Sequence, residues 1–390
     1  MTLTALPTMT TTDATAPSGT VTAAVDPVRL RRARTAYTTR FVSSAIAASA
    51  DGYRIEFGAD VVPRAGDVVL ARVVEIGKHT RLESPVSRRQ LLFPGTEILV
   101  AYGDRYAPDQ FLAHVPDSLA PCHLVAGGGV AGLVTEQHVS IDAATAIEPI
   151  GLLADAHGRV TLDRFAPMGS ATHHLATSAS TATTSTATAS LPPVVAVLGS
   201  SMNSGKSTVL ASLVNGFSNA GLRVAAGKAT GTGAGNDPNQ FRDAGASPVL
   251  DFTDFGHATT FRVGHERIVE ILRAMVLELA AGAPDVVVIE IADGVYQEDT
   301  RRLLEDPVFA EHVDQVLFAA QDALGAVAGL QVLDAAKVAT VAVSGVLTSS
   351  PLATREAAGV LGVPVIDTYA LREPEVALTL LPAGGVSVAR

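Results

Sequence analysis

The sequence predicts an α/β domain built on a parallel sheet, preceded by a smaller β-rich domain that is a barrel or a sandwich. From residue 193 onward, apolar strand-like runs alternate with helical patterns, which is typical of a parallel sheet with helices on both faces. Between residues 27 and 166, short apolar runs are instead bounded by Gly, Pro and Asp and show little helical periodicity. Such runs are typical of short strands joined by turns.

The β-rich domain lies between two segments of low complexity. We expect residues 1–26, which are rich in Thr, Ala and Pro, to form a disordered tail, and residues 167–192, which are rich in Ala, Ser and Thr, to form a linker. The domain opens on VRLRRARTAYTTRFVSSAIAA, for which a short helix and a basic strand are both open. Its predicted strands lie in YRIEFGADVVPRAGDVVLARVVEIG, TEILVAYG, HLVAGGGVAGLVT and GRVTLDRFA.

The second domain, residues 193–390, has a strand followed by a helix as its first unit. The helical pattern after the first strand places Val209, Leu210 and Leu213 on one face, and IVEILRAMVLELAAG predicts another helix. Ligands on parallel sheets bind outside the carboxyl ends of the strands, so functional residues are expected there. The predicted strands lie in PVVAVLG, LRVAAGK, DVVVIEIADG, VDQVLFAAQ, VATVAVSGVL and VPVIDTY.

The charge and composition disfavour several classes of protein. The net charge of -11 offers no large basic surface for nucleic acid or anionic lipid. No apolar run reaches the ~20 residues that span a bilayer, and the first residues lack the basic start and apolar core of a signal peptide. The single cysteine, Cys122, excludes an internal disulfide. We therefore expect a cytoplasmic protein without a membrane partner, and we do not expect a nucleic-acid partner.

The end of the first strand of the second domain carries GSSMNSGKST, Gly199 to Thr208, which is typical of a phosphate-binding loop. Backbone N–H groups and a helix N-terminus would surround a phosphate there. Lys206 would reach the β- and γ-phosphates, and the Ser207 hydroxyl would bind Mg²⁺. The alternative is an ordinary strand-to-helix turn. The expected nucleotide contacts come from Gly199, Ser200, Asn203, Ser204, Gly205, Lys206, Ser207 and Thr208.

The spacing of this loop, G-x5-G-K-S from Gly199 to Ser207, resembles that of dethiobiotin synthetase and related members of the SIMIBI class of P-loop proteins. The resemblance covers the chain from Val194 onward, and it implies a P-loop NTPase domain that uses ATP and Mg²⁺. It also implies that Lys228, at the end of LRVAAGK, lies near the substrate and the γ-phosphate. No N-K-x-D guanine signature follows, which favours ATP over GTP.

The resemblance further implies a metal-binding role for two acidic residues. Asp237 matches the acidic residue that helps to hold Mg²⁺ in the synthetase, although Asp243 lies nearby and loop aspartates often form turns. Glu290 ends a buried strand and resembles the glutamate of the family's VEGAGG motif, where a carboxylate binds Mg²⁺ directly or through water. Ile291 and Asp293 replace glycines of that motif, so the family's backbone contacts to substrate are not carried over. The expected metal ligands are Ser207, Asp237 and Glu290, and the expected catalytic residues are Lys206 and Lys228.

Lysine is scarce in this chain, which makes each lysine informative. Of the 28 basic residues only four are Lys: Lys78, Lys206, Lys228 and Lys337. Arg and Lys differ in chemistry, and two of the four lysines stand in glycine-rich segments. A functional role for Lys228 is therefore favoured over a solvated loop charge.

These features favour an ATP- and Mg²⁺-dependent enzyme, of the kinase, ligase or ATPase type, that transfers phosphoryl to a small-molecule acceptor or activates it. Three alternatives stay open. They are a polynucleotide 5′-hydroxyl kinase, an N-acyltransferase on a P-loop fold as in the D-glutamate N-acetyltransferase family, and an NTP-gated assembly or cofactor-insertion factor. A homodimer is also open. GGGVAG, Gly127 to Gly132, formally fits a dinucleotide pattern, but no helical pattern follows it, so we predict a tight β-turn.

Overall fold

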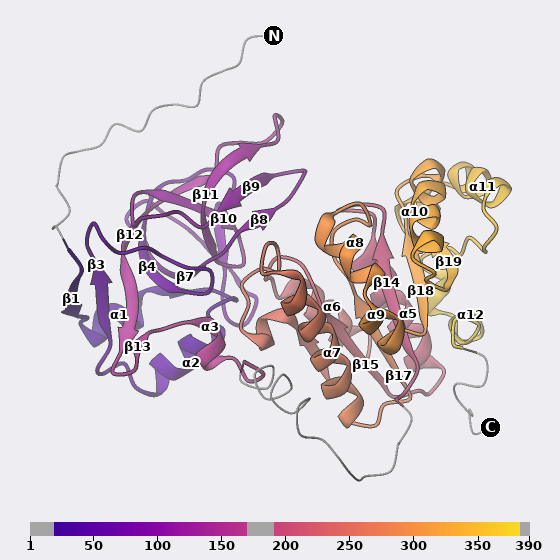
Figure 1. Cartoon of the computed structure of the whole chain (residues 1–390), viewed down its shortest axis with the longest axis horizontal. Helices are drawn as coiled ribbons and strands as arrows, with labels where there is room; N and C mark the ends of the chain where they lie inside the picture. The colour runs from indigo at the N-terminus through magenta and orange to yellow at the C-terminus, as the bar shows by residue number, and fades with distance from the viewer. Residues whose placement is uncertain (1–18, 170–190, 383–390) are drawn as a thin grey trace.

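The computed structural model describes residues 19–169 and 191–382, and Figure 1 shows these two parts side by side. We call residues 19–169 the barrel half and residues 191–382 the P-loop half. Each half has its own main sheet. Most of the expected linker lies outside the described residues, and the domain limits stay a prediction. None of the described helices is long and apolar enough to cross a membrane.

Five strands of the barrel half close into a ring. They pair in the order β12, β4, β7, β11 and β10, and β10 returns to β12. All of these pairings are antiparallel except that between β7 and β11. Ring closure leaves the ring without an open edge, and it confirms the barrel rather than the sandwich. The bounds are β4 (Val68–Glu75), β7 (Glu97–Tyr102), β10 (Cys122–Ala126), β11 (Val130–Gln137) and β12 (Thr145–Asp155).

Shorter elements surround the barrel. The expectation of a tail over residues 1–26 is corrected in part, because residues 21–24 form strand β1 on β3. The β1 side chains are mostly exposed, so backbone pairing holds it without an apolar pattern in the sequence. Residues 1–18 lie outside the described residues. The short strands are β1 (Val21–Ala24), β2 (Arg34–Thr35), β3 (Arg54–Phe57), β5 (Arg81–Glu83), β6 (Arg89–Leu91), β8 (Arg105–Tyr106), β9 (Phe111–His114) and β13 (Gly158–Arg159).

The segment VRLRRARTAYTTRFVSSAIAA, near the start of the barrel half, is mostly helical. Of the two predicted forms, a short helix and a basic strand, the helix is confirmed. The segment forms two helices, α1 (Pro27–Arg32) and α2 (Arg40–Ala48), around the short strand β2. Asp26 caps α1 by accepting a hydrogen bond from the N–H of Val28, and Pro27 occupies the first turn. The expected strand in GRVTLDRFA is wrong beyond its first two residues, because the chain continues as α3 (Leu162–Phe165).

The P-loop half is built on a six-stranded parallel sheet, which confirms the predicted α/β architecture. Its strand order is β16, β15, β17, β14, β18 and β19. All of its pairings are parallel. The central strand β14 is flanked by β17 and β18, so the functional loops after β14 and β17 emerge side by side. The bounds are β14 (Val194–Gly199), β15 (Val224–Lys228), β16 (Val249–Asp251), β17 (Val286–Glu290), β18 (Gln315–Ala319) and β19 (Thr340–Ser344).

Helices cover both faces of this sheet, because successive side chains of each buried strand point to opposite faces. Val195 and Val197 pack in the core with α5, α6 and α12, while Ala196 and Leu198 pack in the core with α7, α8, α9 and α10. The helix bounds are α5 (Lys206–Asn219), α6 (Asn236–Asp243), α7 (His265–Ala281), α8 (Glu298–Glu305), α9 (Pro307–His312), α10 (Ala323–Ala335), α11 (Pro351–Val360) and α12 (Pro374–Leu378).

Two local expectations for the P-loop half were incomplete. VPVIDTY was expected to be a strand, but only Val365 pairs, in a single bridge to Val343. The chain turns directly afterwards, where the carboxylate of Asp367 accepts hydrogen bonds from the N–H groups of Tyr369 and Ala370. The helix α6 was not expected from NDPNQFRD, because this segment has too few apolar residues to show a helical period.

Candidate active site

The loop between β14 and α5 turns tightly because its two glycines carry no side chain. β14 ends at Gly199, and a Cβ there would overlap the Ser204 hydroxyl. Gly205 has a φ of 96°, a left-handed conformation that glycine adopts without steric cost. A Cβ on Gly205 would also stand 3.3 Å from the Cα of Gly345. The two glycines therefore hold the loop in one compact shape.

This loop offers N–H donors and an ammonium group. In the part of the chain that the structure describes, the N–H groups of Asn203, Ser204 and Gly205 donate to no other group. Lys206 is buried, and its Nζ donates to the Ser201 carbonyl oxygen at 2.8 Å. Burial lowers the pKa of Lys206 below its usual value. Unused amides beside a desolvated ammonium fit the phosphate chain of a nucleotide.

The next two strand ends bring Lys228, Asp237 and Glu290 together. Lys228 ends β15 and pairs in register with Glu290, which ends β17. Its Nζ stands 3.0 Å from Glu290 Oε1 and also donates to the carboxylate of Asp237 in α6. Burial by itself lowers the pKa of Lys228, but the two carboxylates together raise it above the usual value. Lys228 is therefore held as a cation beside the loop between β14 and α5.

The three residues expected to hold Mg²⁺ fit the ion in part. The Ser207 hydroxyl is hydrogen-bonded to Asp237, and one oxygen of Glu290, Oε2, is buried without any partner. In residues 19–169 and 191–382, no three His, Cys, Asp or Glu side chains gather as a metal site. Such a donor set suits Mg²⁺, which keeps several waters and binds through one or two carboxylates together with the phosphates of a nucleotide.

Asp293 is a residue of this site whose role the sequence did not suggest. It follows β17 in a left-handed conformation with a φ of 65°, which is uncommon for a residue with a side chain. Burial raises the pKa of its carboxyl to about 6, against the opposing effect of Lys206 and Lys228. A carboxylate with a pKa near neutrality suits proton transfer.

These residues line one side of a cavity of about 990 Å³, and the barrel half lines the other side. This size is at the upper end of the roughly 300–1,000 Å³ range of ligand pockets, so the cavity has room for a nucleotide and a second molecule. Of the expected site residues, Gly199, Ser200 and Ser204 lie in the loop without lining the cavity. Those that line it are Asn203, Gly205, Lys206, Ser207, Thr208, Lys228, Asp237 and Glu290.

The side formed by the barrel half was not predicted from the sequence. It carries four cationic side chains, which we call the basic wall: Lys78, Arg81, Arg89 and Arg105. The barrel half contributes one carboxylate to the lining, that of Glu83, which accepts a hydrogen bond from the N–H of Gly235. The P-loop half contributes two lysines and four carboxylates. The cavity therefore has one predominantly positive wall and one wall with the residues that suit a metal and phosphates.

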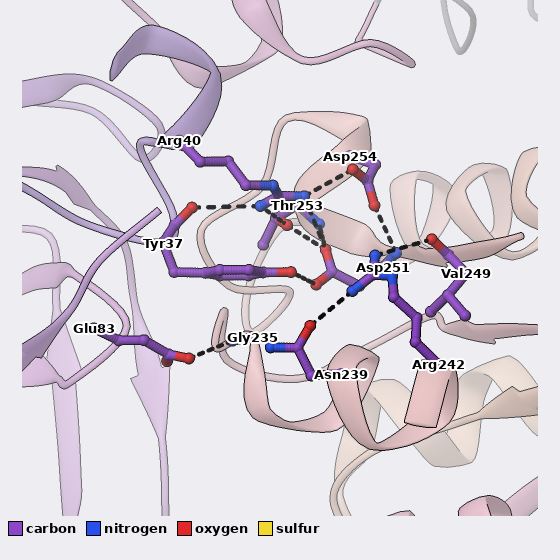
Figure 2. A network of polar contacts seen from close by, with 10 residues as sticks. All are labelled: Tyr37, Arg40, Glu83, Gly235, Asn239, Arg242, Val249, Asp251, Thr253 and Asp254. Atoms are coloured by element: carbon purple, nitrogen blue, oxygen red, sulfur yellow. Dashed lines mark hydrogen bonds and ion pairs between the residues drawn. The ribbon is translucent and has the colours of Figure 1, made fainter. Parts of the chain in front are cut away.

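A buried polar network joins the two halves beside this cavity. Figure 2 shows Tyr37 and Arg40 of the barrel half reaching toward Asp251 and Asp254, which lie at the end of β16 and just after it. The Tyr37 hydroxyl donates to Asp251 Oδ2 at 2.6 Å, and Arg40 Nη2 stands 2.7 Å from Asp254 Oδ1. Arg40 Nη2 also lies 3.8 Å from Asp251. We call these four residues the interdomain joint.

A backbone contact next to the cavity also requires glycine. The three glycines of GGGVAG, residues 127–129, form the turn between β10 and β11, which confirms the predicted β-turn, and VAG begins β11. A Cβ on Gly128 would overlap the carbonyl oxygen of Gly233 in the P-loop half. Gly127 and Gly128 both line the cavity. The absence of side chains here lets the barrel approach the P-loop half closely.

The chain has no match among protein-family models or curated protein sequences. Among solved structures it is similar to the signal recognition particle receptor FtsY from Elizabethkingia anophelis. The identity is 21%, the match covers 45% of this chain and 56% of the receptor, and the TM-score is 0.33. It is also similar to the 54 kDa signal recognition particle protein of Aeropyrum pernix in complex with GDP, with 21% identity, 47% and 43% coverage and a TM-score of 0.34.

A third similar structure is the kinase domain of the Escherichia coli tyrosine kinase ETK. Its identity is 14%, the match covers 48% of this chain and 75% of that domain, and the TM-score is 0.29. The chain thus spans about half the length of the first two proteins, at 56% and 43%. At such levels of similarity, the nucleotide and the reaction have to be argued from the site itself.

Proposed function

We propose that this protein is a nucleotide- and Mg²⁺-dependent P-loop enzyme that transfers the γ-phosphoryl group of ATP to a small-molecule acceptor. The observation that carries the proposal is the convergence of Lys206, Lys228, Asp237 and Glu290 on one wall of a cavity that has a second, chemically different wall. The loop spacing that resembles dethiobiotin synthetase and the SIMIBI class supports the same assignment. A bound Mg²⁺ would neutralise phosphate charge, with Ser207, Asp237 and Glu290 as its protein contacts.

The lysines have distinct roles in this proposal. Lys206 binds the β- and γ-phosphates from the loop, where its ammonium is already desolvated. Lys228 stabilises the negative charge that gathers on the γ-phosphoryl oxygens during transfer. Its two carboxylate partners keep it protonated and aimed at the same place.

Asp293 is the residue that we assign to accept the proton of the acceptor. An acceptor oxygen or nitrogen forms a bond to the γ-phosphorus while the bond to the β–γ bridging oxygen breaks, and the nucleoside diphosphate leaves with that electron pair. The acceptor's proton passes to the Asp293 carboxylate, whose pKa of about 6 suits a base near neutral pH. The residue lies on the cavity wall beside Glu290.

A cavity with two chemically different walls favours a small acceptor over the alternatives. A polynucleotide would need aromatic side chains on which its bases stack, and no Phe, Tyr or Trp of the described residues lines this cavity. An assembly factor that responds to nucleotide needs no room for a second small molecule beside the nucleotide. If the reaction were the transfer of an acyl group, the ion-paired lysine and carboxylates at the strand ends would have no role in it.

Two substitutions in the intact chain test this function. Lys206→Ala is expected to abolish nucleotide binding, whereas Lys228→Ala is expected to spare binding and to lower turnover on the order of 100- to 1,000-fold. Binding is measured with fluorescent ATP and GTP, with and without Mg²⁺, and turnover as nucleoside diphosphate release with panels of small carboxylates, amines and oligonucleotides.

The control is Lys337→Ala, which removes an exposed lysine after α10 and should leave both measurements unchanged. Normal turnover in both Lys206→Ala and Lys228→Ala would remove phosphoryl transfer as the function. Tighter binding of GTP than of ATP would correct the nucleotide. Hydrolysis that responds to a protein and to none of the small acceptors would favour the assembly factor.

A further inference from the structure

Arg105 is a buried cation that forms no ion pair with any residue that the structure describes. It lies in the two-residue strand β8, and only 6% of its surface is exposed. In the part of the chain that the structure describes, no carboxylate lies within ion-pair distance of its guanidinium. Asp109 and Asp293 act on it only from further away, and burial lowers its pKa to about 10. Burying an unpaired charge costs several kcal/mol of folding free energy, so we expect a ligand to pair with this guanidinium.

The hydrogen bonds of Arg105 are also incomplete. Its Nη2 donates to Gln110 Oε1 at 3.0 Å, and its Nη1 stands 3.2 Å from His79 Nε2. The same imidazole nitrogen stands 2.9 Å from the Val125 carbonyl oxygen. A neutral imidazole nitrogen either donates or accepts, so His79 can serve only one of these two groups. The Nε of Arg105 is buried without any partner.

The rest of the basic wall is unpaired as well. Lys78, Arg81 and Arg89 are exposed toward the cavity, and none of them forms an ion pair with a residue that the structure describes. The one carboxylate of this wall, Glu83, is already occupied by the Gly235 N–H and by Ser87. The positive charge of the wall is therefore available to a ligand.

This positive charge is separate from the groups assigned to the nucleotide. Lys206 and Lys228 belong to the P-loop half, while the whole basic wall belongs to the barrel half on the other side of the cavity. We propose that the barrel half selects the acceptor, and that the acceptor carries an oxyanion group, a carboxylate or a phosphate, which Arg105 binds. Gln110 and His79 hold the guanidinium in place, and the three exposed cations attract the anion. This inference rests on the proposed function and names the substrate class of the same cavity.

A buried guanidinium whose partner is an anionic ligand has a measurable effect on the stability of the ligand-free protein. Without ligand it destabilises the fold, so Arg105→Met is expected to keep or raise the melting temperature of the intact chain. A structural arginine would show the opposite sign. The probes are succinate and glycerol 3-phosphate, with neutral succinamide as the matched control, and the readouts are the shift in melting temperature and the Kd from calorimetry.

The expected result is that both anions, or one of them, raise the melting temperature of the wild type while succinamide does not. Arg105→Met is expected to weaken anion binding by at least ~30-fold and to leave the affinity for Mg-ATP unchanged. A larger effect of one anion identifies its class. A lowered melting temperature in Arg105→Met without ligand, an unchanged anion shift, or no anion shift in the wild type would overturn the proposal.

Two further outcomes separate this proposal from the proposed function. If Arg105→Met loses Mg-ATP and keeps the anions, Arg105 serves the phosphates of the nucleotide, and the proposal fails while phosphoryl transfer stands. Lys206→Ala is expected to lose the binding of Mg-ATP and to keep the rise in melting temperature that the anions cause. If instead it keeps Mg-ATP and wild-type turnover, the proposed function fails, while the anion site stands on its own measurements.

Discussion

Two arginines of the barrel half reach toward the P-loop half, and they differ in what surrounds the charge. Arg40 in the interdomain joint has 14% of its side chain exposed and two carboxylates within ion-pair distance. Arg105 in the cavity wall is at least as buried and has no such partner in the described part of the chain. Burial lowers the pKa of both groups, but for Arg40 the carboxylates outweigh this effect and raise the pKa, whereas for Arg105 the pKa falls to about 10.

The difference separates a structural contact from a binding site within one interface. In the joint, the charge of Arg40 is matched by Asp251 and Asp254, and its guanidinium also lies over the Tyr37 ring at 4.4 Å. Every group has a partner, so nothing there requires a ligand. In the cavity wall, Arg105 is buried to a similar degree, but no carboxylate of the described residues lies within ion-pair distance of it. The degree of charge compensation, rather than burial, indicates which part of the interface is functional.

The largest expected effect comes from removing the compensated arginine. Arg40→Met leaves Asp251 and Asp254 buried without their cation, so the free energy of unfolding is expected to fall by about 3–5 kcal/mol. Denaturant unfolding of the intact chain measures it. Arg105→Met is expected to have the opposite sign, and Arg223→Met, at an exposed pair with Asp285, should change little. Equal losses of unfolding free energy in Arg40→Met and Arg105→Met would contradict the proposed difference between the two arginines.

The next effect concerns the imidazole beside the uncompensated arginine. Burial, and then the charge of Arg105, lower the pKa of His79 to about 4. The unfolded chain, with an ordinary pKa of about 6.5, takes up the proton first, so stability is lost as the pH falls from about 6.5 to about 4 and is regained as it rises.

For His79 alone this loss reaches at most about 3 kcal/mol. His79→Gln should make the dependence of unfolding free energy on pH shallower in this window, with His257, whose pKa is also lowered to about 4, accounting for part of what remains. An imidazole NMR titration measures His79 directly. A midpoint near 6.5 would show that the wall is solvated and would weaken the contrast with the joint.

The smallest expected effect is at the backbone contact between the halves. Gly128→Ala places a Cβ against the Gly233 carbonyl, so the halves have to separate slightly, at a cost of about 1–3 kcal/mol. The matched control is Gly359→Ala in α11, where a Cβ meets nothing within 4 Å and should stabilise the helix by about 0.5–1 kcal/mol. Thermal unfolding distinguishes the two. Equal melting temperatures would show that the turn does not support the interface.

The convergence of the predicted site residues of the P-loop half could be anticipated from the sequence, because its signals are local. The loop, Lys228 and Glu290 each stand at the end of an apolar run, and parallel strands bring such ends to one edge. The scarcity of lysine also directed attention to Lys228. The arginines of the basic wall gave no such signal, since 24 of the 28 basic residues are arginine once the four lysines are subtracted.

The barrel side could not be predicted because it is a tertiary feature. The two-residue strand β8 carries Arg105 in a segment without apolar periodicity, and nothing local connects it with Lys206. The same holds for Tyr37, whose partner Asp251 is 214 positions away along the chain. The barrel itself was one of two open forms, and only its strand pairing distinguishes a barrel from a sandwich.

The strand β8 does more than present Arg105. Directly before Arg105, the Asp104 carbonyl oxygen accepts a hydrogen bond from Thr259 at 2.6 Å, and directly after Arg105 the centroid of the Tyr106 ring lies 5.4 Å from that of Phe261. The residues that dock the barrel thus flank the residue that meets the ligand. We therefore expect anion binding by Arg105 and docking of the two halves to be coupled, and by reciprocity each would change the free energy of the other by the same amount.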